Sequence, residues 1–320
     1  MQPFDPIFSN PHALTLAGNF WPRTLDEQRF PVERQLYPTE PGIQVLVQSQ
    51  RPAEPVAGEV ILVHGLEGSG ESGYMRSLSQ AGLEAGYAMH RFHMRSCGGM
   101  AHVCRTLYHA GQTSDLLEVL RRFEAAGCAP VYLIGFSLGG NVALKLAGEL
   151  GDSATRYIAS VCAVSTPIDL DASTRRINRI DNRVYERRFV RRMQQRLLET
   201  GLYTRRDFAG VHSIFTLDEK ITAPFFGFQG AGHYYATQSA VRFLDSIRVP
   251  TLVLQAMDDT FIPFEIFHHP SFKSNPYLNL VATEKGGHLG FIARGRPRFW
   301  LDVQLMEWIR RHPVKRVTST

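Results

Sequence analysis

Residues 131–141 read VYLIGFSLGGN. Their first part is a β-branched and aromatic run typical of a buried strand, and the residues from Asn141 to Leu150 favour a helix. Gly-x-Ser-x-Gly lies between them, and this order predicts a nucleophile elbow, a tight turn that holds a serine at the end of a strand. Glycines suit such a turn because a Cβ would clash there. We therefore predict that Ser137 is a covalent nucleophile.

The five-residue motif needs its context to be informative. About one chain of this length in ten contains Gly-x-Ser-x-Gly by chance. Alone, it describes a glycine-rich loop with an exposed serine. The apolar strand before it and the Ala- and Leu-rich helix after it favour the elbow.

The composition indicates a globular protein. The chain has 320 residues, of which 44% are hydrophobic and 20% are charged, enough for one large α/β domain with an insertion. The first residues, MQPFD, lack the features of a secretory signal, and no apolar run approaches the ~20 residues of a membrane helix. The cysteines have no CxxC or zinc-like spacing, so we expect reduced thiols, no metal and a cytoplasmic location. They are Cys97, Cys104, Cys128 and Cys162.

Positive charge is unevenly distributed. The net charge is +5, arginines crowd residues 175–206, and a basic tail spans residues 310–316. Such runs occur in proteins that bind nucleic acid or anionic membranes, but more often they form the solvated face of a helix. We expect no nucleic-acid partner. Peripheral contact with an anionic membrane through the basic region stays open at this point.

Strand-like and helix-like segments alternate along the first half of the chain. The strands are expected at 60–63, 88–92, 131–134 and 158–164, and the helices at 74–85, 113–125 and 141–150. Thr113, Ser114 and Asp115 are N-cap candidates for the second of these helices. Alternation with continuously apolar strands predicts a parallel sheet that is covered on both faces.

The alternation stops at Thr166-Pro167 and resumes with strands at 251–255 and 278–282 and a helix at 297–311. Between these parts, one long helix is expected from apolar residues at four-residue spacing. They are Tyr185, Phe189, Met193 and Leu197. This stripe is either a core-facing seam or the apolar underside of a lid. We predict a catalytic core in two parts, 1–166 and 240–320, with an inserted helical cap at 167–239.

A nucleophilic serine needs a base, and the base needs a carboxylate that orients it. In α/β-hydrolases these residues follow in the order Ser, Asp or Glu, His, each just beyond a strand. Asp259 and Asp258 both follow the strand at 251–255. We favour Asp259, which lies four residues before Pro263, and expect Asp258 to brace the turn. The expected base is His288, which follows the last strand in a glycine-rich loop.

Two backbone N–H groups should form an oxyanion hole that stabilises the tetrahedral anion. The first belongs to Leu138, the residue after the nucleophile. The second is expected from Leu66, in the loop that follows the strand at 60–63. No metal or organic cofactor is needed for this chemistry.

Residues 68–73, GSGESG, also match the dinucleotide fingerprint Gly-x-Gly-x-x-Gly after a strand. That interpretation predicts an acidic residue about 20 positions further on. Residues 85–100 contain no Asp or Glu, although Arg91 and Arg95 could serve a 2′-phosphate instead. The preceding His64-Gly65 fits an oxyanion loop better.

Together these motifs resemble the YheT-like family of α/β-hydrolases, relatives of the α/β-hydrolase-domain lipid esterases. The resemblance runs from about residue 8 to residue 309. It rests on HGLEGS at 64–69, RSCGG at 95–99, YHAG at 108–111 with Thr113 and Asp115, GFSLGGN at 135–141, GGHLGF at 286–291, and Asn10-Pro11-His12 with Thr15. It implies an α/β-hydrolase fold, with a mostly parallel sheet, helices on both faces and a helical cap.

The resemblance further implies a triad of Ser137, Asp259 and His288, and hydrolysis of short-chain acyl esters or monoacylglycerol-like lipids. Two departures concern the substrate more than the chemistry. Ser96 stands where the family often has glycine, and the cap is unusually rich in arginine, with His233 where an acid is expected. His109 is expected to bond to its own loop rather than to line the pocket, and Cys97 to be a packed thiol.

Two other functions remain open from sequence alone. The same triad would serve an acyltransferase, which passes the acyl group to an alcohol or thiol instead of water. A non-catalytic protein could instead bind anionic lipid or nucleic acid through the arginine-rich cap, and its binding would survive Ser137→Ala. A serine esterase is favoured, because a binding module has no need of the Ser, Asp and His constellation.

Overall fold

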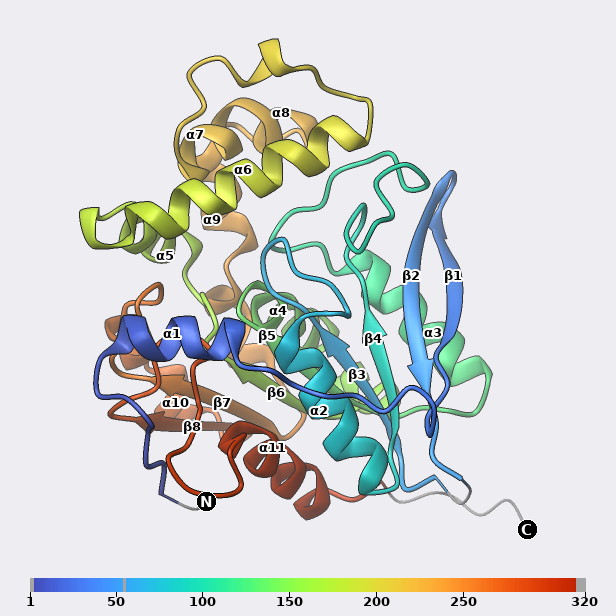
Figure 1. Cartoon of the computed structure of the whole chain (residues 1–320). Coiled ribbons are helices and arrows are strands. Elements are labelled where there is room, and N and C mark those ends of the chain that lie inside the picture. Colours follow the sequence, from blue (N-terminus) through green and yellow to red (C-terminus); the bar gives the residue numbers. More distant parts are fainter. Residues whose placement is uncertain (1–2, 54–55, 315–320) are drawn as a thin grey trace.

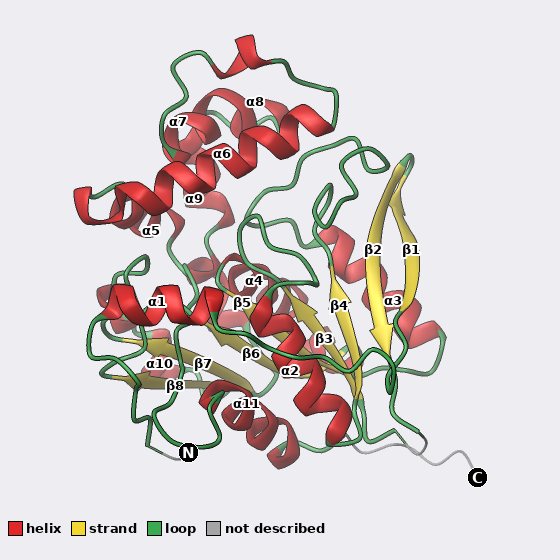
Figure 2. Ribbon diagram, in the orientation of Figure 1, coloured by secondary structure: helices red, strands yellow, loops and turns green. Residues whose placement is uncertain are grey.

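The computed structural model describes residues 3–53 and 56–314. One sheet of eight strands lies at its centre, in the order β1-β2-β4-β3-β5-β6-β7-β8, with helices on both faces (Figures 1 and 2). The strands are β1 (Glu33–Glu40), β2 (Ile43–Gln50), β3 (Glu59–Val63), β4 (Ala88–Phe92), β5 (Val131–Phe136), β6 (Ile158–Val164), β7 (Thr251–Ala256) and β8 (Leu278–Thr283). The six strands expected from the sequence correspond to β3–β8, and the predicted fold class is confirmed.

The helices fall into two groups. Those around the sheet are α1 (Pro11–Phe20), α2 (Gly73–Glu84), α3 (Ser114–Ala125), α4 (Leu138–Leu150), α10 (Ser271–Ser274) and α11 (Trp300–Arg311). Those between β6 and β7 are α5 (Leu170–Ile177), α6 (Arg183–Glu199), α7 (Ile214–Leu217), α8 (Ala223–Phe225) and α9 (Ala231–Gln238). Thr113 does not cap α3 with its side chain, because its hydroxyl donates to Glu149 instead.

Strand direction decides where the site can form. From β4 across to β8, each strand runs parallel to its neighbour, whereas β2 pairs antiparallel with both β1 and β4. The carboxyl ends of the parallel strands meet at one edge of the sheet, which is where open α/β sheets bind ligands. The loops that follow β3, β5, β7 and β8 are therefore brought together.

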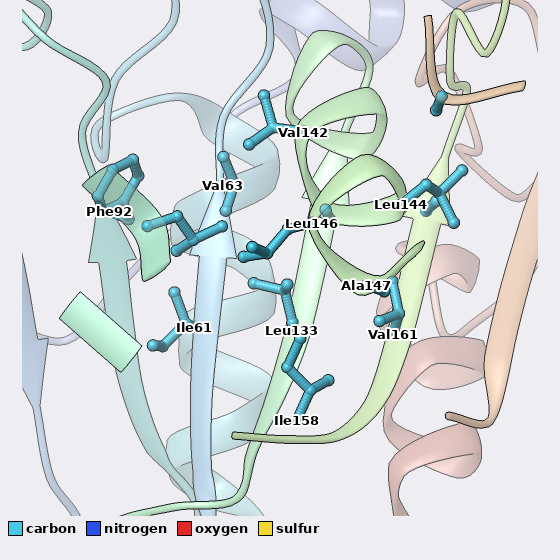
Figure 3. Packing of buried hydrophobic residues seen from close by; sticks show 14 of the residues in the cluster. Ile61, Val63, Phe92, Leu133, Val142, Leu144, Leu146, Ala147, Ile158 and Val161 are labelled. Atoms are coloured by element: carbon cyan, nitrogen blue, oxygen red, sulfur yellow. The ribbon is translucent and has the colours of Figure 1, made fainter. Parts of the chain in front are cut away.

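Alternate residues of the central strands face two apolar layers. In β3, Ile61 and Val63 belong to the layer that includes α3 and α4, whereas Val60 and Leu62 belong to the layer that includes α2 and α11. Figure 3 shows the first layer, in which Leu133 of β5 lies near α4. Since side chains alternate along a strand, burial on both faces explains why these strands read as continuous apolar runs.

The segment between β6 and β7 is helical and lies above the carboxyl edge of the sheet (Figure 1). We propose that residues 167–239 form a cap on a core made of residues 1–166 and 240–320, and we call this segment the cap. Its long helix α6 carries the predicted apolar stripe. Met193 and Leu197 are buried there, in a cluster with Ile214 and Leu217 of α7.

A buried carboxyl joins α2 to α11. Asp302, in the first turn of α11, accepts a hydrogen bond from the Ser77 hydroxyl, and burial raises its pKa to about 6. The folded protein therefore keeps this proton at pH values where the unfolded chain, with an ordinary pKa near 4, has lost it. The carboxyl contributes most to stability below pH ~4, and this contribution is lost as the pH rises through ~6.

We expect Asp302→Asn to remove that loss. Wild-type unfolding free energy should fall between pH ~4 and ~6 relative to the variant, by up to about 3 kcal/mol. Urea denaturation at several pH values measures it, with Asp152→Asn, at an exposed position, as the control. Equal pH dependence of wild type and Asp302→Asn would contradict the prediction.

Candidate active site

Ser137 lies on a strained turn between β5 and α4. Its backbone has φ 51° and ψ −122°, which is unusual for a residue with a side chain. A Cβ on Gly135 would collide with the carbonyl oxygen of Gly139, and one on Gly139 would collide with the carbonyl oxygens of Val63 and His64. The two glycines are thus required by close backbone contacts, as the elbow predicts.

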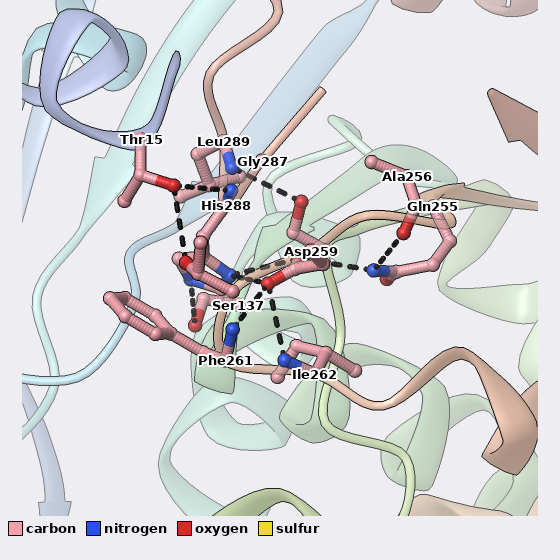
Figure 4. Close-up of polar contacts among 12 residues, drawn as sticks. Thr15, Ser137, Gln255, Ala256, Asp259, Phe261, Ile262, Gly287, His288 and Leu289 are labelled. Atoms are coloured by element: carbon pink, nitrogen blue, oxygen red, sulfur yellow. Dashed lines mark hydrogen bonds and ion pairs between the residues drawn. The ribbon is translucent and has the colours of Figure 1, made fainter. Parts of the chain in front are cut away.

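The structure brings Ser137, His288 and Asp259 together (Figure 4). The Ser137 Oγ lies 3.0 Å from His288 Nε2, and His288 Nδ1 lies 3.1 Å from each carboxylate oxygen of Asp259. His288 and Asp259 are buried, with 8% and 5% exposure. With the Nδ1 proton donated to Asp259, the free lone pair of Nε2 faces the serine hydroxyl.

The two adjacent aspartates have different partners. Asp259 also accepts hydrogen bonds from the backbone N–H groups of Phe261 (2.8 Å) and Ile262 (3.1 Å) and from Gln255 Nε2 (3.0 Å). These bonds fix the carboxylate against the histidine ring. Asp258 instead accepts from the Gly287 N–H at 2.9 Å, and so braces the loop that carries the histidine.

Helix α1 supports the same loop from the other side. Thr15 Oγ1 accepts a hydrogen bond from the His288 N–H at 2.9 Å and donates to the Pro11 carbonyl at 2.8 Å. A Cβ on Gly287 or Gly290 would collide with backbone carbonyls of α1. The helix backbone and the loop backbone are therefore in direct contact, which positions the imidazole.

The two expected oxyanion donors lie beside Ser137. Leu138 is the first residue of α4, so its N–H has no acceptor within the helix. Leu66 lines the same cavities as Ser137. Its loop is fixed by His64, whose pKa burial lowers to about 4. The neutral ring donates from Nδ1 to the Gly65 carbonyl (2.7 Å) and accepts from the Met94 N–H (3.1 Å).

The residue after Leu66 is held by the cap. Glu67 has a left-handed backbone, with φ 53°, and is buried. Arg196 of α6 donates from Nε to both carboxylate oxygens of Glu67, at 2.9 and 3.1 Å, and Arg192 donates to its carbonyl at 2.7 Å. Tyr108 accepts from the Glu67 N–H at 3.1 Å. Arg196 also donates to Ser96 Oγ at 2.8 Å, so the two departures noted in the sequence contact each other.

Breaking this ion pair should weaken both stability and activity. Removing one partner of a buried pair leaves the other charge unpaired, so Arg196→Met should lower the free energy of unfolding by about 3–5 kcal/mol. We expect kcat/KM for an ester to fall by about tenfold or more, because the loop of Leu66 loses its anchor. Urea denaturation and steady-state kinetics measure the two effects.

The neighbouring Arg191, exposed on the same helix, supplies the control variant Arg191→Met. It should change neither quantity appreciably. Adding Glu67→Gln to Arg196→Met should restore part of the stability, because no unpaired charge then remains buried. Equal stability of the two arginine variants would exclude an important role for the ion pair.

Two cavities meet at the serine. The narrower one, about 80 Å³, has a mainly apolar lining and lies between the sheet edge and the cap helices. The wider one, about 450 Å³, is a more polar groove between α1, the loop at 65–74 and α6. Ser137, His288 and Leu66 line both. Phe189, of the predicted apolar stripe, also faces both, which supports the lid interpretation of α6.

Other residues singled out in the sequence have structural partners. The buried guanidinium of Arg91 donates to the Gly70 carbonyl at 2.9 Å, and Arg95 forms an ion pair with Asp115, so both arginines that could serve a 2′-phosphate have partners within the protein. Burial raises the pKa of Cys97 to about 12, which keeps it a thiol. His109 accepts from the Gly111 N–H but, contrary to expectation, also lines the narrow cavity.

A family model described as "Alpha/beta hydrolase family" matches residues 60–300. The chain belongs to this family. It is 29% identical over 313 residues to "Putative esterase YheT" of Escherichia coli (strain K12), covering 94% of this chain and 91% of that protein. The resemblance to the YheT-like family is thus confirmed.

More distant relatives are longer proteins. The chain is 28% identical to "Monoacylglycerol lipase" of Saccharomyces cerevisiae and 27% identical to "Phospholipase ABHD3" of Mus musculus, but spans only 58% and 59% of their lengths, with 78% and 75% of this chain covered. Among solved structures, the esterase Pf2001 of Pyrococcus furiosus has a TM-score of 0.60 at 18% identity, covering 92% of this chain and 99% of that one. At this identity the likeness concerns the fold.

Several residues at the site were not predicted. Gln255 and Thr15 position Asp259 and His288, and Arg196 anchors the loop of Leu66. Thr15 belonged to a motif shared with the family, but no role followed from it. No candidate metal site was found within the described ranges 3–53 and 56–314, and none of the helices described there is long and apolar enough to cross a membrane.

Proposed function

We propose that the protein is a serine hydrolase that cleaves carboxylic esters through an acyl-enzyme. The observation that carries this proposal is the continuous contact from Ser137 Oγ to His288 to Asp259 at the carboxyl edge of the sheet. The esterase and lipase names of the relatives support the same reaction. Nothing in the proposed chemistry requires a cofactor.

The reaction follows from the positions of the groups. Ser137 Oγ bonds to the ester carbonyl carbon while its proton moves to His288 Nε2, and Asp259 stabilises the imidazolium. The N–H groups of Leu66 and Leu138 stabilise the resulting oxyanion. Collapse breaks the bond to the alcohol, which leaves with the proton from His288. Water then attacks the acyl carbon while its proton moves to His288. The bond between the acyl carbon and Ser137 Oγ breaks, Oγ takes the proton from His288, and the carboxylic acid is released.

The two cavities suggest how an ester is oriented. The narrow apolar cavity suits a short acyl group, which stays bound to Ser137 after the first step. The wider, more polar groove suits the alcohol, which must depart while the acyl-enzyme persists. We therefore propose short-chain acyl esters, including monoacylglycerol-like esters, as the substrate class.

A fluorophosphonate probe tests the nucleophile without knowledge of the substrate. We expect one adduct on Ser137, identified by mass spectrometry, and none in His288→Ala. A series of methyl esters of increasing acyl length should then show highest kcat/KM for short acyl groups. Products formed with and without added alcohol separate hydrolysis from acyl transfer. Well-folded protein that forms no adduct would refute the proposal.

A further inference from the structure

The narrow cavity contains a buried acid that the proposed mechanism does not use. Asp218 is 5% exposed and lines this cavity together with Ser137. It begins a π-helical turn, η4 (Asp218–Thr222), which follows α7 in the cap. π-helical turns are rare in proteins, and those that occur often lie at functional sites. Much of the surrounding lining is aliphatic, including Ile214, Leu217 and Leu170.

The hydrogen bonds that Asp218 accepts come from neutral groups and do not neutralise its negative charge. Its Oδ2 accepts from the Tyr235 hydroxyl at 2.7 Å, a neutral donor. Burial raises its pKa to about 6, opposed only by hydrogen bonds from Tyr235 and Thr222. At neutral pH the carboxyl is mostly ionised in an apolar cavity, which is costly unless a donor or a cation compensates it.

The cations near this cavity are bound elsewhere. Arg196 also lines it, but its guanidinium is bonded to Glu67 and Ser96. Burial lowers the pKa of His109 to about 3, so this ring is neutral at pH 7. Lys220, two residues beyond Asp218, donates to the Ala209 carbonyl at 2.8 Å. The carboxylate thus remains available to a ligand.

We infer that Asp218 is a specificity residue that binds a hydrogen-bond donor, a hydroxyl or an ammonium group, at the distal end of a short acyl chain attached to Ser137. This inference rests on the proposed function and names its substrate class. The donor would add a hydrogen bond to those from Tyr235 and Thr222, while the aliphatic lining contacts the chain. An acyl chain that ends in a methyl group would bury the carboxylate without this further donor, which a polar site penalises strongly.

Matched esters that differ only at the distal atom test the inference. The set is methyl pentanoate, methyl 4-hydroxybutanoate and methyl 4-aminobutanoate, with homologues one carbon shorter and longer. The rate of hydrolysis of each ester is measured near neutral pH from the release of acid. For at least one acyl-chain length, we expect the kcat/KM of an ester that ends in a hydrogen-bond donor to exceed that of its methyl-ended counterpart by about tenfold or more. A preference for the methyl-ended ester at every length would overturn the inference.

Two variants assign the preference to Asp218. Asp218→Leu, similar in shape, should reverse it in favour of methyl ends. Asp218→Asn retains an acceptor, so it should keep a preference for hydroxyl over methyl and lose one for ammonium. Glu219→Gln is the control, because Glu219 accepts from the Ala231 N–H and does not line the cavity. A donor preference that persists in Asp218→Leu would also overturn the inference.

The two proposals can fail separately. If the protein forms the Ser137 adduct and hydrolyses the esters but prefers methyl ends, the role of Asp218 is rejected and the proposed esterase activity stands. Absence of both hydrolysis and adduct would reject the esterase, and the inference with it. Should Asp218→Leu fail to fold, the wild-type preference and Asp218→Asn still decide the question.

Discussion

Ser137→Ala is expected to abolish covalent labelling and to lower kcat/KM for short-chain esters by about 10⁴- to 10⁶-fold. The hydroxyl oxygen is the atom that would bond to the acyl carbon, and it lies 3.0 Å from His288 Nε2. The fold should persist, because the backbone N–H of Ser137 still donates to the Val164 carbonyl at 2.8 Å. Labelling with a fluorophosphonate and ester hydrolysis measure the effect.

Ser160→Ala is the matched control for this substitution. Ser160 is a buried serine of β6 that is away from the site, and its variant should retain labelling and hydrolysis. Ester hydrolysis that survives in Ser137→Ala would mean that the reaction uses another group. The non-catalytic binding function would gain support if neither the wild-type protein nor Ser160→Ala were labelled.

Asp259→Asn should lower kcat by about 10³- to 10⁴-fold, whereas Asp258→Asn should lower it by less than about tenfold. Asparagine at 259 cannot satisfy the three donors that surround the carboxylate and also accept the Nδ1 proton, so the histidine loses its orientation. At 258, the amide oxygen can still accept from the Gly287 N–H.

Steady-state kinetics of these two variants decide whether Asp258 or Asp259 orients the histidine, which the sequence left open. Both substitutions remove one charge from adjacent positions, so a general electrostatic effect would act on them similarly. Thermal unfolding of each variant shows whether a loss of activity reflects a loss of structure. A larger loss of activity in Asp258→Asn, with its fold intact, would reverse the assignment.

The sequence predicts the six parallel strands of the sheet, β3–β8, well, because most of them are buried on both faces and are largely apolar. It misses both antiparallel strands, β1 and β2. The sequence of β1, ERQLYPTE, is largely exposed and contains Pro38, as edge strands often do. Helix α1 was also missed, although Asn10 caps it and Pro11 begins it. That signal was available, since proline at the first position of a helix after an N-cap residue is common.

The candidate site likewise has a part that the sequence predicts and a part that it does not. The order of Ser137, Asp259 and His288 along the chain, each after a strand, follows from the topology of a parallel sheet. Contacts between the cap and the core cannot be predicted from spacing, because they depend on how surfaces from distant parts of the sequence meet in three dimensions. Arg196 and Glu67 are 129 residues apart in the sequence, and nothing local pairs them.

The contact between α1 and the His288 loop also has a consequence for biosynthesis. Thr15 emerges from the ribosome long before the loop that it supports, which lies 273 residues further along the chain. Until that loop is made, α1 lacks the hydrogen bond and the backbone contacts that it makes with the loop, and such distant contacts form late in folding. The imidazole can be seated only after the loop of His288 has been synthesised. A nascent chain would thus remain inactive toward esters until this loop has left the ribosome.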